Sequence, residues 1–108
     1  MNRGDNMEDY PAGLFIRDYL LKHGEGRPYD MWKEYTKLVK KDVKLKTFYT
    51  YISILSKLGL VEISRIMKKR RGRTYYYRLT EKGRSKEAED VFARPMYYVR
   101  LMSEVKQE

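Results

Sequence analysis

The chain has 108 residues, a length that accommodates one domain. Hydrophobic residues make up 42% and aromatic residues 14%, which is enough for a packed core and excludes intrinsic disorder. No apolar run approaches the roughly 18 residues of a membrane span, and the absence of cysteine excludes disulfides and thiolate sites. The formal net charge of +9 favours binding to a polyanion. We therefore expect a soluble cytoplasmic protein with no membrane contact.

The polar lead over residues 1–9 is expected to be frayed. Apolar residues at helical spacing then predict a first helix over 11–23, which ends at Gly24. A second helix is predicted from Pro28 to Lys40, and a third from Leu45 to Leu58. Gly59 follows the third helix as its C-terminal cap. The first half of the chain therefore reads as three consecutive helices.

The hydrophobic period changes after the third helix. Residues 60–64 and 75–79 alternate between apolar and polar, so they predict two short antiparallel strands around a basic hairpin. Because side chains alternate between the two faces of a strand, Tyr75 and Tyr77 are expected in the core and Tyr76 outside it.

Thr80 is a suitable N-cap for one more helix, which is predicted to run through Phe92. Pro95 interrupts that helix, and Met96–Val105 is expected to resume as a second helical piece. The order of three helices, a hairpin and a helix is that of an α+β winged helix-turn-helix. We expect this domain over residues 10–92, with a C-terminal helical extension over 93–108.

Two stretches of sequence resemble the winged helix-turn-helix superfamily. The run SILSKLGLVE, Ser53–Glu62, resembles the end of a recognition helix leading into the wing, and YYYRLTEKG, Tyr75–Gly83, resembles the returning wing strand and the start of the next helix. Both are similar to archaeal and bacterial transcriptional regulators of the PadR-like and MarR-like kinds. The resemblance implies a double-stranded DNA-binding regulator or a chromatin-associated factor.

The charge distribution agrees with DNA binding. Between Lys40 and Lys86, fifteen Lys and Arg residues accompany three acidic residues, a net charge of +12, whereas the rest of the chain carries −3. On the third helix, Lys46, Thr50, Ser53 and Lys57 fall opposite the apolar side, where small hydroxyls can approach base edges in a major groove. No Arg, Asn or Gln lies on this face, so sharp base discrimination is not expected. The alternative is an ordinary solvated helix face.

The hairpin carries six cations in nine residues, and Gly72 allows a tight tip that can enter a minor groove. The alternatives for this run are a solubilising loop or a localisation signal. Lysines in the turn before the third helix extend the same surface. The predicted DNA contacts are Lys41, Lys44, Lys46, Thr50, Ser53, Lys57, Arg65, Lys68, Lys69, Arg70, Arg71 and Arg73.

No catalytic, cofactor or metal site is predicted. His23 is the only histidine, and the acidic residues are scattered, so neither a catalytic triad nor a metal cluster has support. The Tyr75–Tyr77 run leaves a role in stacking on unpaired bases or RNA open. A further alternative is a protein-interaction winged helix in a replication, transcription or membrane-remodelling assembly.

Two expectations concern assembly and source. Large apolar residues crowd the C-terminal extension, so homodimerisation through residues 92–105 is predicted, with the duplex half-sites about 34 Å apart. Glutamine and asparagine occur only near the chain ends, at Asn2, Asn6 and Gln107, while charged residues make up 36%. This composition is typical of thermophilic proteins and favours an archaeal source. As a DNA-binding protein, the chain is expected to be associated with the nucleoid.

Overall fold

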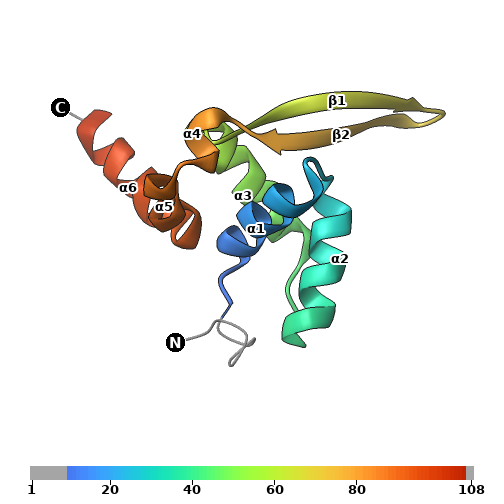
Figure 1. Cartoon of the computed structure of the whole chain (residues 1–108), viewed down its shortest axis with the longest axis horizontal. Coiled ribbons are helices and arrows are strands. Elements are labelled where there is room, and N and C mark those ends of the chain that lie inside the picture. Colours follow the sequence, from blue (N-terminus) through green and yellow to red (C-terminus); the bar gives the residue numbers. More distant parts are fainter. Residues whose placement is uncertain (1–9, 107–108) are drawn as a thin grey trace.

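The structure is a computed structural model that describes residues 10–106, with side chains to residue 101, so the predicted lead over residues 1–9 lies outside it. Figure 1 shows a long hairpin projecting from a group of helices, with the C-terminal helix on the opposite side. In chain order the elements are α1 (Ala12–His23), α2 (Pro28–Val39), α3 (Leu45–Lys57), β1 (Val61–Lys69), β2 (Gly72–Leu79), α4 (Glu81–Arg84), the 3-10 turn η3 (Lys86–Ala88), α5 (Glu89–Ala93) and α6 (Pro95–Lys106).

The three predicted helices are confirmed to within one residue at each end. Pro28 occupies the first turn of α2, where its missing N–H costs nothing. Gly24 follows α1 with φ of +84°, and Gly59 follows α3 with φ of +77°. Both glycines adopt the left-handed conformation that ends a helix, which is why the helical pattern stops where the sequence predicted.

The strands are longer than predicted. The two strands pair from Val61↔Leu79 to Lys69↔Gly72, and their register shifts once, between Ile63 and Arg65. Most of the expected basic loop is therefore strand, and only Arg70 and Arg71 form the turn. Gly72 has φ of +100°, which confirms the tight tip. The expectation of short strands was wrong because Arg and Lys in an exposed hairpin keep their side chains in water while their backbones pair.

The single helix predicted from Thr80 to Phe92 was also wrong. Thr80 does cap it, since its hydroxyl accepts from the N–H of Gly83, but α4 ends after one turn at Ser85, whose backbone is extended. Buried Arg17 of α1 donates to the carbonyls of Gly83, Arg84 and Ser85 at 2.9–3.1 Å. Because one guanidinium donates hydrogen bonds to these carbonyls, α4 can end here without leaving them unpaired.

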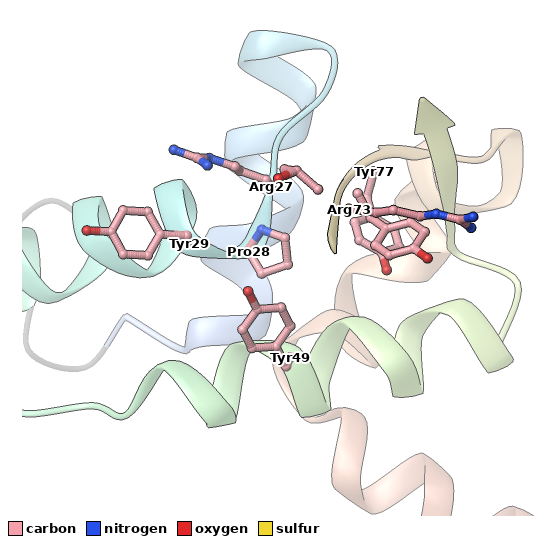
Figure 2. A pocket seen from close by; sticks show the side chains of 8 residues that line it. Arg27, Pro28, Tyr29, Tyr49, Arg73 and Tyr77 are labelled. Atoms are coloured by element: carbon pink, nitrogen blue, oxygen red, sulfur yellow. The ribbon is translucent and has the colours of Figure 1, made fainter. Parts of the chain in front are cut away.

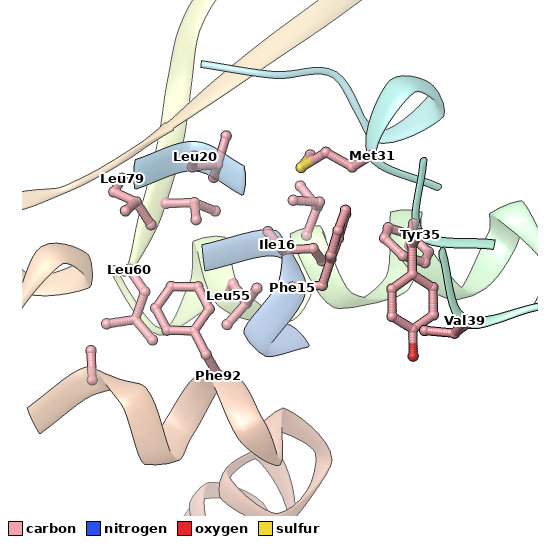
Figure 3. Close-up of a cluster of buried hydrophobic side chains, with 14 residues drawn as sticks. Phe15, Ile16, Leu20, Met31, Tyr35, Val39, Leu55, Leu60, Leu79 and Phe92 are labelled. Carbon is pink, nitrogen blue, oxygen red and sulfur yellow. The ribbon is translucent and has the colours of Figure 1, made fainter. Parts of the chain in front are cut away.

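One hydrophobic core joins all the elements up to α5. Figure 3 shows side chains of α1 and α2 meeting Leu55 of α3, Leu60 and Leu79 at the base of the hairpin, and Phe92 of α5. Phe92 is fully buried. The helices α1 and α5 approach so closely that a Cβ at Gly13 would lie 2.0 Å from the carbonyl oxygen of Phe92. Within the described residues, no helix is long and apolar enough to cross a membrane.

Candidate nucleic-acid interface

One side of α3 is anchored in the core and the other faces water. Phe48, Ile52 and Leu55 are buried. The four polar residues that the sequence placed opposite them are all exposed, namely Lys46, Thr50, Ser53 and Lys57. The helix therefore presents a continuous polar face, as a helix must if it is to enter a major groove.

The turn before α3 adds positive charge at the start of the helix. Lys41 and Lys44 are exposed, and Lys44 occupies the N-cap position. No acidic residue lies in the first turn of α3, so the positive end of the helix dipole adds to these charges. The indole of Trp32 donates to the carbonyl of Val43, which ties the turn to α2. The lysines therefore extend from a fixed turn.

The hairpin, which we call the wing, has two faces of different composition. The inner face, which turns towards α3, carries the cross-strand pairs Ile63–Tyr77, Ile66–Tyr75 and Lys68–Arg73. The outer face carries Glu62–Arg78, Arg65–Tyr76 and Met67–Thr74. The inner face begins in the core at Val61 and Leu79 and continues beyond it into solvent.

Outer-face cations at the base of the wing have acidic partners, whereas Lys69 of the same face, opposite Gly72 at the tip, is exposed. The guanidinium of Arg65 lies 2.8 Å from Glu25 and 4.0 Å from the ring centroid of Tyr76. The Ser64 hydroxyl also donates to Glu25. The hydrogen bond from Ser64 has the largest effect on the pKa of the Glu25 carboxyl and that from Arg65 the next largest, and both hold this pKa below its usual range. Arg78 lies 2.8 Å from Glu62. Arg65 therefore differs from the other predicted wing contacts, because it braces β1 against the segment before α2.

That segment also joins the wing through its backbone. Gly26 and Tyr77 exchange two hydrogen bonds, of 2.8 and 2.9 Å, outside the β1–β2 pair. The base of the wing is thus held by α3 on one side and by the chain before α2 on the other. The tip of the hairpin extends away from the helices (Figure 1).

The tyrosine run departs from its predicted arrangement. Tyr77 packs against the core, but Tyr75 is 37% exposed, so its assignment to the core was wrong. The reason is the length of the strands, which carries Tyr75 past the last core side chain. Tyr76 does lie on the other face, where Arg65 covers its ring.

A cavity of about 340 Å³ lies where α2, α3 and the inner face meet, and we call it the tyrosine cavity. Figure 2 shows the ring of Tyr49 rising from α3 towards Pro28, while the side chains of Arg27 and Tyr29 extend away from the wing. Tyr75, Tyr77 and Arg73 line it from the wing. Burial raises the pKa of Tyr77, and the neighbouring Tyr75 and Tyr49 raise it further.

Sequence reasoning missed Tyr49. It lies three residues after Lys46 and four before Ser53, so helical spacing alone places it beside the predicted contact face. A second cavity, of about 300 Å³, joins Tyr49, Ser53 and Lys57 of α3 to Ile63 and Tyr77 of the wing. The structure thus brings the contact face of α3 and the inner face of the wing together as the two walls of one groove.

No group of three or more His, Asp or Glu side chains among the described residues is arranged to hold a metal ion. His23 is exposed at the end of α1 and lies against Tyr19, with 4.2 Å between ring centroids. Neither residue lines the groove between α3 and the wing.

Solved structures with the same architecture come from several organisms. A protein of Thermoplasma acidophilum assigned as a transcriptional regulator aligns with a TM-score of 0.64 and 14% identity, over 89% of this chain and 88% of its own. The fold is a winged helix-turn-helix. A PadR family transcription regulator of Clostridium difficile aligns with a TM-score of 0.59 and 17% identity, over 90% of this chain and 98% of its own.

The YusO protein of Bacillus subtilis aligns with a TM-score of 0.54 and 22% identity, over 86% of this chain but 60% of its own. No protein-family model and no curated protein sequence matches this chain. At these identities the similarity establishes the fold. The α+β winged-helix architecture, and the resemblance to winged-helix regulators that the sequence suggested, are therefore confirmed at that level.

Proposed function

We propose that this protein binds double-stranded DNA as a transcriptional regulator or chromatin-associated factor. In this arrangement α3 lies in the major groove, and the wing tip lies on the adjacent backbone or minor groove. One observation carries the proposal. The exposed face of α3 and the cationic inner face of the wing turn towards the same space and so form the two walls of a groove. Two of the similar structures are of proteins assigned as transcription regulators.

The proposed contacts divide by chemistry. Thr50 and Ser53 are short enough to let α3 approach base edges, and the lysines at both ends of α3 reach phosphates. Arg70, Arg71 and Gly72 form the tip, which is narrow enough for a minor groove. Arg65 is proposed to act by holding the wing, since its guanidinium already contacts Glu25 and Tyr76. The phosphate contacts are Lys41, Lys44, Lys46, Lys57, Lys68, Lys69, Arg70, Arg71 and Arg73.

Salt dependence tests the proposal directly. Fluorescence anisotropy would compare duplex DNA, single-stranded DNA and duplex RNA over a series of salt concentrations. If 5 to 8 phosphates are neutralised, log K should fall against log salt with a slope of roughly −4.5 to −7 for the DNA duplex. A slope near zero, or stronger binding to duplex RNA, would refute duplex DNA as the ligand.

A homodimer formed through α6 is the second part of the proposal. Phe92, at the start of the predicted dimer segment, is buried in the core of its own chain and is not exposed for contact with a second copy. Beyond it, Met96, Tyr97 and Leu101 remain 52%, 46% and 39% exposed. Met102 and Val105 lie outside the residues whose side chains are described. The exposed apolar face of α6 is suited to burial against a second copy of itself.

One carboxylate links α5 to the start of α6. Asp90 of α5 accepts two hydrogen bonds from Arg94, at 3.0 and 3.2 Å, and one from the Tyr98 hydroxyl at 2.6 Å.

Light scattering of the full chain and of Leu101→Glu tests the dimer, with Leu21→Glu on α1, at another exposed leucine, as the control. We expect Leu101→Glu alone to shift the protein to monomer. A monomeric parent chain would refute the dimer.

Two finer proposals are a thermophilic archaeal source, which the composition supports, and association with the nucleoid, which follows from the proposed DNA binding. Amides, which are thermolabile, are confined to the chain ends, and charged residues make up 36%. A melting temperature above about 90 °C would bear out the thermophilic source.

A further inference from the structure

The proposed duplex contacts leave the tyrosine cavity unused, although it opens into the same groove. Its wall from α3 is Tyr49, which is 52% exposed, and its wall from the wing includes Tyr75, which is 37% exposed. Ligand pockets in proteins are concave and are lined mainly by apolar and aromatic side chains. A volume of about 340 Å³ is at the lower end of the range, from about 300 Å³, in which small planar groups are bound.

Charges near the cavity are arranged asymmetrically. Arg27 is held by Asp30 at 2.8 Å and lies over the ring of Tyr29, so its guanidinium is directed away from the wing (Figure 2). Arg73 lines the cavity from β2, and Lys68 stands opposite it in the ladder. The cavity therefore combines four tyrosine side chains with one cation, Arg73, on its wing side. This combination matches a flat apolar ring attached to a phosphate.

The position of the cavity narrows the ligand to a nucleotide within a DNA strand. When a recognition helix occupies a major groove and a wing reaches the adjacent minor groove, the strand that separates the two grooves passes between them. In this protein that path crosses the opening between α3 and the inner face, where Tyr49 and Tyr75 lie. Bases of an intact duplex cannot enter, because their faces are covered by stacked neighbours.

We propose that the tyrosine cavity takes up an unpaired base from a bulge in the bound duplex, with Tyr49, Tyr75 and Tyr77 contacting the base and Arg73 its phosphate. This inference rests on the proposed duplex binding. Stacking between bases and aromatic side chains is tolerant of sequence, since every base has an aromatic face. The protein would then recognise a structural irregularity of DNA by its shape, which fits the lack of base-discriminating side chains on α3.

The test uses the full chain and a short duplex with one bulged 2-aminopurine, a fluorescent adenine analogue. A matched duplex without the bulge is the reference. We expect tighter binding to the bulged duplex, by about tenfold or more, and quenching of the 2-aminopurine as it stacks. Free 2-aminopurine nucleoside monophosphate at the same concentration should not be quenched, which separates a base within a strand from a free nucleotide.

Three variants locate the effect, each checked for folding by circular dichroism. Tyr49→Leu and Tyr75→Leu remove a ring and should abolish both the preference for the bulge and the quenching. Tyr76→Leu is the matched control, because it removes a ring from the same strand on the outer face, and it should retain both. Tyr75→Phe keeps the ring plane and should also retain both.

The outcomes separate this inference from the proposed function. Equal binding of bulged and paired duplexes would overturn the inference and leave duplex binding intact. Loss of the preference in Tyr76→Leu but not in Tyr49→Leu would overturn it as well, as would equal quenching of the free nucleotide. Failure to bind either duplex would instead refute the proposed function.

Discussion

The two faces of the wing carry basic and aromatic residues alike, but the surroundings of those residues differ. On the outer face, Arg65 pairs with Glu25 and covers the ring of Tyr76, and Arg78 pairs with Glu62. On the inner face, Lys68 and Arg73 stand side by side as like charges, next to the partly exposed Tyr75. Near its base the outer face thus pairs its cations with carboxylates, whereas the inner face leaves positive charge uncompensated.

This difference teaches that the number of cations in a segment does not by itself predict how strongly that segment binds a polyanion. Two adjacent cations repel each other, and that cost is repaid when a polyanion binds between them. A cation that already has a carboxylate partner gains less from a phosphate, because it must first give up its existing contacts. The inner face is therefore the one that we expect to respond most when the charge of the protein is altered.

The largest expected effect comes from placing negative charge in the groove. The double variant Thr50→Glu, Ser53→Glu should weaken duplex binding by about 100-fold or more, because carboxylates would face phosphates at the centre of the contact. Anisotropy at fixed salt measures it. The double variant Lys22→Ala, Lys33→Ala removes the same net charge from exposed positions on α1 and α2. Equal losses in the two variants would mean that α3 does not enter DNA.

Removing the tip cations should have the next largest effect. The triple variant Arg70→Ala, Arg71→Ala, Arg73→Ala should flatten the salt slope by about 2 to 3, as expected when three phosphate contacts are lost. Its melting temperature should remain near that of the parent, since these side chains lie outside the core. The triple variant Lys22→Ala, Lys33→Ala, Lys86→Ala is the charge-matched control. If both triple variants flatten the slope equally, the wing has no special role.

A single pair of substitutions compares the two faces directly. Arg73→Ala should lower the salt slope by about 0.9 without changing the melting temperature. Arg65→Ala should leave the salt slope unchanged. It should lower the melting temperature slightly, because Glu25 and the ring of Tyr76 lose their partner. Salt titration and thermal denaturation of both variants decide between the roles. A slope change in Arg65→Ala as large as that in Arg73→Ala would make Arg65 a direct contact.

The smallest expected effect is a pH dependence of the outer face. The pKa of Glu25 is lowered from its ordinary value of 4.5 in the folded chain, so its ion pair stabilises the fold above that pH. The stabilisation is lost as the pH falls through the lowered pKa. Thermal denaturation should therefore show Glu25→Gln less stable than the parent at neutral pH, with the difference shrinking below pH 4.5 and vanishing only below the lowered pKa of the folded chain. A difference that persists in acid would show that the carboxylate charge is not the cause.

Local patterns were sufficient wherever neighbouring residues set the structure. The helix bounds at Gly24 and Gly59 follow from the left-handed backbone that glycine adopts easily, and the burial of Phe48, Ile52 and Leu55 follows from helical periodicity. The long strands were missed because charge runs are read as loops. The break after α4 was missed because its cause, Arg17, lies 66 to 68 residues earlier in the chain.

The sequence by itself determined the order of elements, the winged-helix fold and the segment in which cations gather, because periodicity, caps and charge are local properties. Only the tertiary structure decided which cations are already paired and which aromatic rings line a cavity. Glu25 meets Arg65 across 40 residues, and Tyr49 of α3 lines the same cavity as Tyr75 of the wing. Such contacts depend on how separate elements pack against one core, and no spacing along a single element encodes them.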